Sequence, residues 1–569
     1  MEDRVEALLK KALVRLRENG SLPPDLELAG PVERPRREEF GDFGTALPLA
    51  MAKALRLPPA RCAEMIQEVL DPPEGLFQEI SFAPPGYLNF RVRPEAWWAA
   101  LQEATSLPRV GGGERVLLEF VSANPTGPLH VGHGRGAVLG DALARLMRAT
   151  DYAVETEYYV NDVGNQMAML GLSLHARGRE ALGLSDGSDF PENGYRGQYI
   201  REIAARWVAT PEGEAACRRP YEDLGPRDDN AATAVASREL LEWIRRTLGD
   251  ARITFDHWFH ERPLHRDGEV QRMLDSLLRD GKAFRDDSGA ILFRMEGTED
   301  SEDRVLVRGN GMPTYFAADV AYHHHKFLRG FQRLINIWGA VHHGYIPRVR
   351  ASLEALGHDP GALQVLLVQM VTLTRGGVAV PMGKRSGEFV TLQDVLDEVG
   401  TDAVRFLFLL RRPDAQMEFD LDLARSQSLE NPVYYVQYGH ARVASIVRRA
   451  AAAGIPVPPW SGELLAALSL PEEAALTRDL VRWPGVVGSA ARRCEPHHVA
   501  FYLLDLVKAF HGYYTRYRHT EKVLSADPRK TAARLYLVSR IRDVLHQGLS
   551  LLGVSAPDEM RLPEDDETA

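Results

Sequence analysis

The chain has little cysteine and no long apolar run. Its 569 residues include three cysteines, Cys62, Cys217 and Cys494, which lie far apart in the sequence. An odd number of widely spaced cysteines argues against a disulfide framework and against a cysteine-based zinc site. No uninterrupted apolar stretch could span a bilayer, and the charged first residues lack the apolar core of a secretory signal. We therefore expect a cytoplasmic protein with no membrane partner.

A Walker phosphate-binding loop is also missing, and the chain shows no internal repeats. A net charge of −11 by itself disfavours a nucleic-acid partner, but the charge is unevenly distributed along the chain. Residues 431–555 contain 16 lysines and arginines against 9 acids, so this region is basic. Between residues 508 and 522 the cations interleave with tyrosines and histidines. That mixture suits phosphate contact and stacking on unpaired bases, although a solvated helical surface is the alternative.

Residues 116–133 predict a strand, a turn and a helix start. Residues 116–121 form a short apolar run typical of a buried parallel strand, which Pro125, Gly127 and Pro128 interrupt. Helical spacing follows, so His130 and His133 should face the same side of the first helical turn. A helix N-terminus attracts phosphate, and this one would lie at the carboxyl end of a parallel strand. The pattern therefore indicates a nucleotide site without a Walker loop.

The sequence His130-Val131-Gly132-His133 resembles the HIGH signature of class I aminoacyl-tRNA synthetases. The longer stretch 119–135 resembles, more narrowly, the arginyl-tRNA synthetases. Further stretches are similar to that family and occur in its order, namely residues 159–166, 313–319, 338–345 and 431–438. The resemblance spans most of the chain. It implies a ligase that forms arginyl-adenylate from L-arginine and ATP and transfers the arginyl group to tRNA(Arg). It also implies Mg²⁺ accompanying ATP, no protein metal site, and a monomer.

Three domains are expected. Strand-like runs at 116–121, 153–160, 334–337 and 363–368 alternate with helical stretches within residues 109–425. This alternation predicts a multidomain α/β protein with a parallel, doubly wound, Rossmann-like catalytic sheet. Residues of about 167–300 have a charged, helical character and are interpreted as an insertion. Residues 1–108 predict an α+β domain, and residues 426–569 an all-α domain. The resemblance assigns tRNA contact to the first and anticodon binding to the last.

The ATP site is expected to combine the histidine motif with a distant loop. Residues 380–387 are similar to the family's KMSKS loop in a degenerate form, in which Pro381 replaces the first lysine and Lys384 fills the position of the second. A lysine on such a loop can close over the triphosphate. The predicted catalytic residues are His130, His133 and Lys384, and the predicted ATP contacts are these three with Gly132, Met382 and Arg385.

Arginine recognition should rest on carboxylates, because guanidinium binds them in a fork. By their match to the family, Glu119 and Asp319 are the acidic contacts and Tyr315 lies beside them, since residues four apart on a helix share a face. Asn124 would hold the backbone ammonium or carboxylate of the substrate. The complete predicted set is Glu119, Ser122, Asn124, Tyr315, Asp319 and His342.

Each of these residues, taken alone, is more often structural than functional. Tyr438, Arg442 and Tyr517 are the candidates for tRNA contact, on the basic character of their region alone. Two other functions stay open. One is a class I ligase for cysteine or glutamate, although the cysteine enzyme usually has a cysteine-based zinc site. The other is a non-catalytic tRNA-binding paralogue, against which the intact His130, His133 and Lys384 argue.

Overall fold

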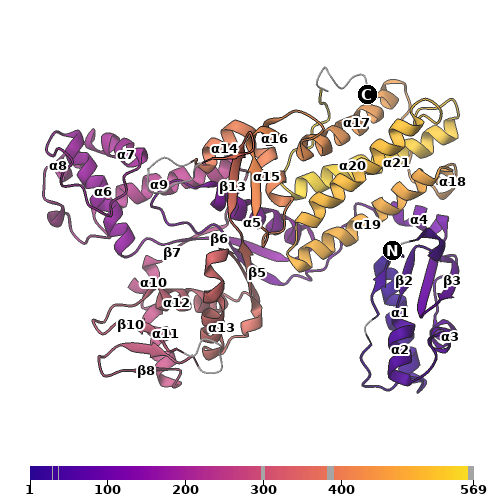
Figure 1. The fold of residues 1–569 in the computed structure, drawn as a ribbon, viewed down its shortest axis with the longest axis horizontal. Coiled ribbons are helices and arrows are strands. Elements are labelled where there is room, and N and C mark those ends of the chain that lie inside the picture. The colour runs from indigo at the N-terminus through magenta and orange to yellow at the C-terminus, as the bar shows by residue number, and fades with distance from the viewer. Residues whose placement is uncertain (29, 36, 296–301, 381–389, 562–569) are drawn as a thin grey trace.

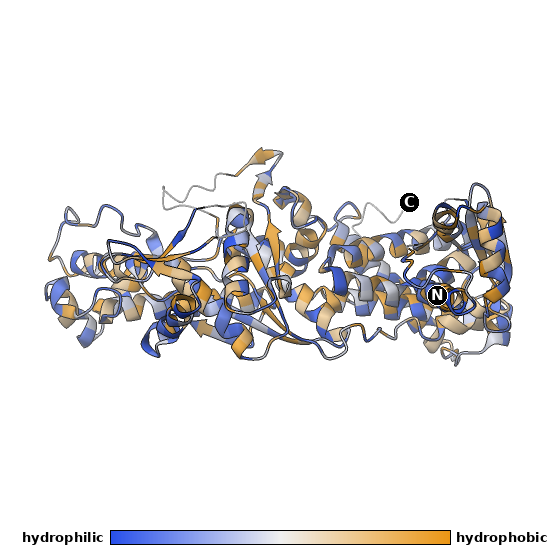
Figure 2. Cartoon of the chain, turned by 90° about the horizontal axis from the view of Figure 1, so that it is seen from below, coloured by the Kyte–Doolittle hydropathy of each residue, from blue (hydrophilic) through white to orange (hydrophobic). Residues whose placement is uncertain are grey.

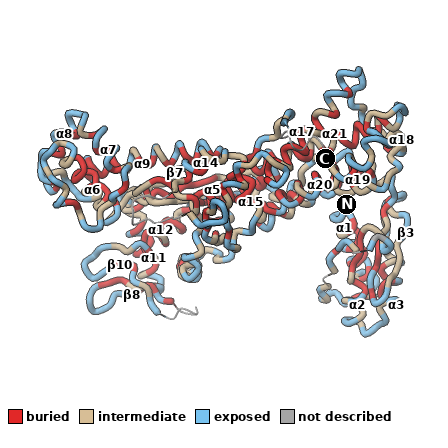
Figure 3. The backbone as a smooth tube through the Cα atoms, turned by 45° about the horizontal axis from the view of Figure 1, so that its top comes forward, coloured by how far each residue is buried: buried red, intermediate tan, exposed pale blue. Residues whose placement is uncertain are grey.

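The computed structural model describes residues 1–28, 30–35, 37–295, 302–380 and 390–561. The chain forms an elongated molecule with a small N-terminal domain, a central sheet with its helices and satellite units, and a C-terminal group of long helices (Figure 1). Buried residues line the inside of each part (Figure 3), and one hydrophobic cluster runs through the N-terminal domain, the central sheet and the C-terminal helices, while the satellite units have clusters of their own. Along the helices, hydrophobic and hydrophilic residues alternate rather than forming one continuous band (Figure 2). Within the described ranges, no helix is long and apolar enough to cross a membrane.

The N-terminal domain packs helices on a small antiparallel sheet of order β1-β2-β4-β3. Hydrophobic residues of α1, such as Val5 and Leu9, recur on one face and are buried against this domain's core. The α+β prediction is confirmed here. The elements are α1 (Glu2–Glu18), β1 (Val32–Glu33), η1 (Glu38–Phe40), β2 (Phe43–Thr45), α2 (Leu47–Leu55), α3 (Pro59–Val69), β3 (Phe77–Ala83), β4 (Tyr87–Val92) and α4 (Pro94–Leu101).

The central sheet is parallel and has the order β12-β11-β5-β6-β7. Its strands are β5 (Arg115–Glu119), β6 (Ala153–Val160), β7 (His257–His260), β11 (Arg333–Gly339) and β12 (Leu363–Val368). The chain begins at β5 in the middle, moves outward to β7, and returns to β11 on the other side of β5. The point between β5 and β11 is therefore a topological switch point, where doubly wound sheets bind ligands. The Rossmann-like prediction is confirmed.

The segment 167–300, expected to be a helical insertion, also contains strands. Its first part is helical and comprises α6 (Asn165–Ala181), α7 (Gln198–Val208), α8 (Pro211–Cys217), η2 (Tyr221–Leu224) and α9 (Ala231–Asp250). Strand β7 then rejoins the central sheet beside β6. A second unit follows, consisting of α10 (Arg262–Arg266), α11 (Glu269–Arg279) and an antiparallel sheet of β8 (Ala283–Arg285), β9 (Ile291–Phe293) and β10 (Arg304–Val307). Figure 1 shows the two units on different sides of the sheet.

The remaining elements of the catalytic part surround the switch point. Helix α5 (Val131–Ala149) follows β5, and α12 (Tyr315–Leu328) precedes β11. After β11 come η3 (Ala340–Tyr345), α13 (Ile346–Ala355) and η4 (Pro360–Ala362). A third sheet of order β14-β13-β15 follows β12, with elements β13 (Val371–Arg375), β14 (Val378–Ala379), α14 (Leu392–Val399), α15 (Thr401–Leu409), β15 (Met417–Asp420) and α16 (Leu421–Arg425).

The C-terminal part is helical, as predicted. It consists of α17 (Pro432–Ala452), α18 (Gly462–Leu465), α19 (Pro471–Arg493), α20 (His497–Tyr517) and α21 (Pro528–Leu551). A buried charge network joins three of its segments, because Arg534, fully buried on α21, contacts Glu473 on α19 at 2.7 Å and Glu521 at 2.7 Å. Trp460 donates a hydrogen bond to the Trp98 carbonyl at 2.9 Å, which connects this part to the N-terminal domain.

One buried arginine attaches the C-terminal helices to the catalytic part. Arg405 on α15 is fully buried, donates to the Leu552 carbonyl at 3.0 Å and to the Ala251 carbonyl at 2.9 Å, and pairs with Asp141 on α5. The neighbouring Gly553 has a φ of 69° and packs directly against the guanidinium. The contact thus gathers the ends of α9 and α21 around α5.

Replacing Arg405 with methionine should destabilise the whole chain. The substitution removes the buried one of two arginine partners of Asp141, leaving only the partly exposed Arg145, and it removes donors from two carbonyl groups. Breaking a buried pair typically costs about 3–5 kcal/mol. The measurement is the midpoint of thermal unfolding by calorimetry. Arg411→Met, at an exposed position just beyond the same helix, is the matched control and should leave the midpoint nearly unchanged. Equal midpoints for both variants would contradict the anchoring role.

Candidate active site

The carboxyl end of β5 makes a sharp turn toward α5. The strand ends at Glu119, earlier than the predicted 121, because Val121 and Ser122 adopt left-handed backbone angles with φ of 68° and 41°. The Ser122 hydroxyl donates to Glu119 Oε1 at 2.8 Å and accepts from the Tyr159 N–H at 3.1 Å. These two bonds hold the strained turn against β6 and orient the Glu119 carboxylate.

His130 and His133 form a stacked pair that also caps α5. Nδ1 of His130 accepts from the N–H groups of Gly132 at 3.1 Å and His133 at 3.4 Å, and Nδ1 of His133 accepts from the His130 N–H at 3.3 Å. The ring centroids are 3.6 Å apart. Because each Nδ1 accepts from the backbone, each neutral ring carries its proton on Nε2. Capping and substrate contact are therefore compatible in these residues, since they use opposite ring nitrogens.

A buried lysine lies behind Glu119. Lys326 on α12 is fully buried, and its Nζ donates to Glu119 Oε2 at 2.5 Å and to Asn336 Oδ1 at 3.2 Å. Asn336 on β11 is directly opposite Glu119 in the parallel register, and its Nδ2 donates to His323 at 2.8 Å. Burial would raise the pKa of Glu119, but the Lys326 charge and hydrogen bond, with His323 and Ser122, bring it below its usual value. Glu119 is therefore ionised and already paired.

Asp319 has a different environment one turn into α12. Its Oδ2 accepts a hydrogen bond from the Tyr345 hydroxyl at 2.6 Å. Burial raises the pKa of Asp319 to about 7, and the charges of Glu119 and Glu261 add to that effect, while the Tyr345 bond opposes it. Burial and the Lys326 charge lower the pKa of the nearby His323 to about 3, so that ring is neutral. Two acids in one site thus have pKa values pushed in opposite directions.

These side chains surround one cavity of about 570 Å³ at the switch point. Of the predicted residues, eight line it: Glu119, Ser122, Asn124, His130, Gly132, His133, Asp319 and His342. Tyr315 is more than half exposed at the start of α12 and is not part of the lining that the described residues form. Met382, Lys384 and Arg385 lie outside the described residues. Asn124 donates to Gln166 at 2.6 Å, so its amide is held by the start of α6.

Sequence reasoning missed several residues of this site. Tyr159, Tyr322 and Trp338 line the cavity. His323 also lines it, although the run His323-His324-His325 is expected to be structural or on the surface. Lys326 lies behind the cavity. Only the residues on α12 could have been found from the sequence. Residues three or four apart share a helix face, so His323 and Lys326 are expected on the same side of this helix as Asp319.

The predicted tRNA contacts lie on the C-terminal helices. The Tyr438 side chain is buried, and its hydroxyl accepts from Arg442 at 2.7 Å. The Arg442 guanidinium also lies over the Tyr514 ring, 5.3 Å from its centroid. Tyr517 donates to Glu472 at 2.9 Å and lines a cavity of about 210 Å³ with cationic and aromatic neighbours, which include Arg449, Tyr513, Tyr514, Arg518 and Lys522. Arg442 and Tyr517 are thus more accessible than Tyr438.

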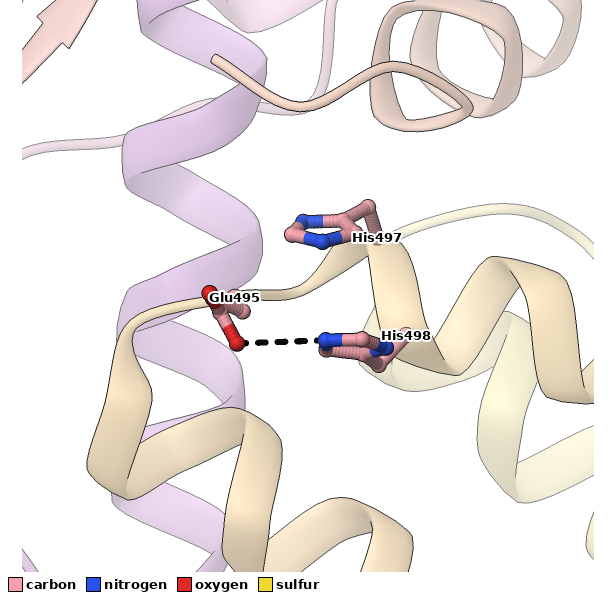
Figure 4. Close-up of side chains that lie close together, drawn as sticks. All are labelled: Glu495, His497 and His498. Atoms are coloured by element: carbon pink, nitrogen blue, oxygen red, sulfur yellow. Dashed lines mark hydrogen bonds and ion pairs between the residues drawn. The ribbon is translucent and has the colours of Figure 1, made fainter. Parts of the chain in front are cut away.

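Glu495, His497 and His498 form the one group of three potential metal ligands found among the described residues, with ligand atoms within 4.8 Å of one another. Figure 4 shows Glu495, in the connection between α19 and α20, beside His498 in the first turn of α20. The Glu495 carboxylate contacts His498 at 3.1 Å and Arg493 at 2.8 Å. Its charge already has a cationic partner, and we assign no metal to this group.

Three family models match consecutive parts of the chain. Residues 3–92 match the arginyl tRNA synthetase N-terminal domain, residues 99–409 the class I (R) tRNA synthetase catalytic domain, and residues 436–560 the DALR anticodon binding domain. The chain belongs to the arginyl-tRNA synthetase family. The predicted resemblance is confirmed, and every residue placed around the cavity falls within the catalytic-domain match.

Members of the arginyl-tRNA synthetase family match along nearly the whole chain. The arginine–tRNA ligase of Desulfosudis oleivorans is 46% identical over 98% of this chain and 100% of its own length. That of Syntrophotalea carbinolica is 47% identical over 93% of this chain and 94% of its own length. The Thermus thermophilus arginyl-tRNA synthetase structure has a TM-score of 0.76 and 26% identity, covering 98% of this chain and 100% of that one.

The raised pKa of Asp319 predicts how the stability of the folded chain depends on pH. The folded-state pKa of about 7 lies above the ordinary 3.8, so folding favours the protonated acid and stability is lost as pH rises from about 4 to about 7. Asp319→Asn keeps the shape without the ionisation. It should unfold at a higher temperature than the wild type at pH 8, a gain of at most roughly 4 kcal/mol, with a clearly smaller gain at pH 5 and a similar temperature only below about pH 4. A constant difference across pH would contradict the assignment.

Proposed function

We propose that the cavity at the switch point is where this arginine–tRNA ligase activates arginine. The observation that carries the proposal is one cavity lined both by the stacked histidines that cap α5 and by two acids, the buried Glu119 and the partly buried Asp319. The histidines suit phosphate, and the acids suit guanidinium. The site contains partners for both substrates within one space, which favours this role over a non-catalytic paralogue.

In the proposed reaction, the carboxylate oxygen of arginine attacks the α-phosphorus of ATP. A P–O bond forms to the arginyl carboxylate and the bond to pyrophosphate breaks, giving arginyl-adenylate. The terminal ribose hydroxyl of tRNA then takes the arginyl group and AMP leaves. Neither step needs a protein nucleophile, so the protein acts by positioning and by stabilising charge on phosphate oxygens. Mg²⁺ enters as the counter-ion of the ATP phosphates.

His130 and His133 would donate from Nε2 to those phosphate oxygens, with Gly132, Met382 and Arg385 as further ATP contacts. The backbone bonds to Nδ1 support this role, because they fix the ring orientation before the substrate arrives. Lys384 would contact the triphosphate as a point charge. Loss of one such preorganised donor typically slows catalysis by about 10²–10³.

Arginine would lie with its guanidinium toward Asp319 and Glu119 and its backbone groups toward Asn124, near Ser122 and His342. Tyr315 is on the same helix as Asp319 but is exposed and outside the cavity lining formed by the described residues, so it would contact the substrate only after a local rearrangement. A buried carboxylate without a fitting partner is costly, and sites of this kind reject wrong substrates by up to about 10⁴–10⁵. Lysine should therefore be a poor substrate.

We propose the same division of labour among the domains that the sequence predicts. Residues 1–108 contact tRNA, residues 109–425 catalyse, and residues 426–569 bind the anticodon, with Arg442 and Tyr517 as the accessible candidates and Tyr438 as their support. The basic, tyrosine-rich cavity beside Tyr517 supports stacking on a base. We also propose that the protein is monomeric and cytoplasmic, which light scattering and cell fractionation test.

The deciding experiment is tRNA charging with each amino acid in turn. Only arginine should be transferred to tRNA(Arg), because only guanidinium pairs with both the charge and the shape of the two acids. Pyrophosphate exchange should be run with and without tRNA, since members of this family generally need tRNA to activate arginine. Charging with glutamate or cysteine instead of arginine would end the proposal.

Lys384→Ala should separate binding from chemistry. If Lys384 contacts the triphosphate, its loss slows arginine activation by roughly 10²-fold or more and leaves the affinity for arginine nearly unchanged. Single-turnover exchange and equilibrium binding of arginine measure the two quantities. Lys282→Ala, at an exposed position in the second satellite unit, is the control and should change neither. An equal loss in both quantities for Lys384→Ala would show that the assignment is wrong.

A further inference from the structure

Two acids on neighbouring strands are each neutralised by a cation from α12. Glu119 on β5 pairs with Lys326 at 2.5 Å, and Glu157 on β6 pairs with Arg329 at 2.6 Å. Both carboxylates are almost fully buried, and Glu119 and Glu157 are opposite each other in the parallel register. Lys326 lies in the last turn of α12 and Arg329 is the residue that caps this helix, so both cations come from the same side of its C-terminal end. Buried charges of this kind persist only with such partners.

Lys326 satisfies its own ammonium completely within the protein. Besides Glu119 and Asn336, it lies over the Tyr322 ring, 4.2 Å from the centroid. Tyr322 in turn donates to Glu157 at 2.7 Å. The ammonium is therefore fixed on the side of Glu119 away from the cavity, while the carboxylate itself lines the cavity. A substrate meets Glu119 as part of a neutral ion pair.

Asp319 lacks an equivalent partner in the described contacts. The hydroxyl of Tyr345 is a neutral donor, and the other groups that face this carboxylate are acids or are committed elsewhere. Tyr159 donates to Glu261 at 2.7 Å, and His323 is held by Asn336 and by the Asp319 carbonyl. The titratable and charged groups around Asp319 are Glu119 on β5, Tyr159 on β6, Glu261 before α10, His323 and Lys326 on α12, and Tyr345 at the end of η3.

We propose that Lys326 is a positioning residue that sets the charge of the amino-acid site. It keeps Glu119 ionised and paired from behind, so that Asp319 is the one acid whose charge changes when the guanidinium arrives. Where Asp319 is protonated in the empty site, below about pH 7, the empty site carries no excess negative charge and arginine binding releases the Asp319 proton. The inference rests on the proposed function, since it assigns the cavity to arginine.

This charge arrangement also predicts what happens without Lys326. In Lys326→Met, Glu119 is buried beside Asp319 with no cation, and the two acids compete for protons. Glu119 then takes up a proton itself, and arginine must bind a site with less negative charge. If Glu119 is made neutral at the same time, in Glu119→Gln with Lys326→Met, no unpaired charge remains and Asp319 titrates alone as before.

The test is the pH dependence of arginine affinity, measured by calorimetric titration of the full chain between pH 6 and 9. In the wild type, the dissociation constant should fall about tenfold per unit as pH rises to about 7 and then level off. Lys326→Met should bind arginine more than about tenfold more weakly at pH 7.5, with its midpoint displaced by about one unit or more to higher pH. The double variant should have a midpoint at or below that of the wild type.

Arg329→Met is the matched control. It removes a paired cation from the same side of the end of α12 and leaves the buried Glu157 without its arginine partner. Glu157, however, is not part of the cavity lining formed by the described residues. Its midpoint should equal that of the wild type. An unchanged midpoint in Lys326→Met, or equal shifts in the single and double variants, would overturn the role of Lys326. Failure of the wild type to bind arginine at any pH would instead overturn the proposed function.

Discussion

The pairing of Glu119 with Lys326 is the constraint on which the centre of the molecule depends. It joins the carboxyl end of β5 to α12, and through Asn336 it includes β11, the strand on the other side of the switch point. A buried carboxylate at this position is tolerable only if a cation reaches it, and that fixes how α12 lies on the sheet. The same placement brings Asp319 and His323 to the cavity wall. The structural pair thus also determines which side chains face the substrate.

The two histidines of the motif, like the Glu119–Lys326 pair, have both a structural and a ligand-facing role. A helix N-terminus leaves backbone N–H groups without partners, and the two rings satisfy some of them through Nδ1. The backbone in return fixes the orientation and the tautomer of each ring. A side chain held this way needs little rearrangement when phosphate arrives, which lowers the cost of binding. Helix capping and ligand contact are therefore two aspects of one arrangement in His130 and His133.

The sequence predicts well what depends on local pattern. The strands expected at 153–160 and 363–368 coincide with β6 and β12, and the histidine motif lies at a helix start as its spacing indicates. Contacts between distant residues were not predictable, because nothing in the residues near 119 or 326 announces that the two meet. Strand β7 was missed for a related reason, since its short run His257–His260 is a strand only by pairing with β6. Tyr315 matches the family pattern yet lies outside the cavity lining that the described residues form.

The attachment of α21 through Arg405 limits how freely the C-terminal helices can be swapped between related proteins. Arg405 on α15 donates to the Leu552 carbonyl at the end of α21. Gly553 lies against the guanidinium and has a positive φ, which residues other than glycine rarely adopt. A side chain at position 553 would occupy the space of the guanidinium. The C-terminal helices are therefore not a freely interchangeable module. A chimaera would need the arginine on one side of the junction and the glycine on the other to come from compatible parents, although the two lie far apart along the gene.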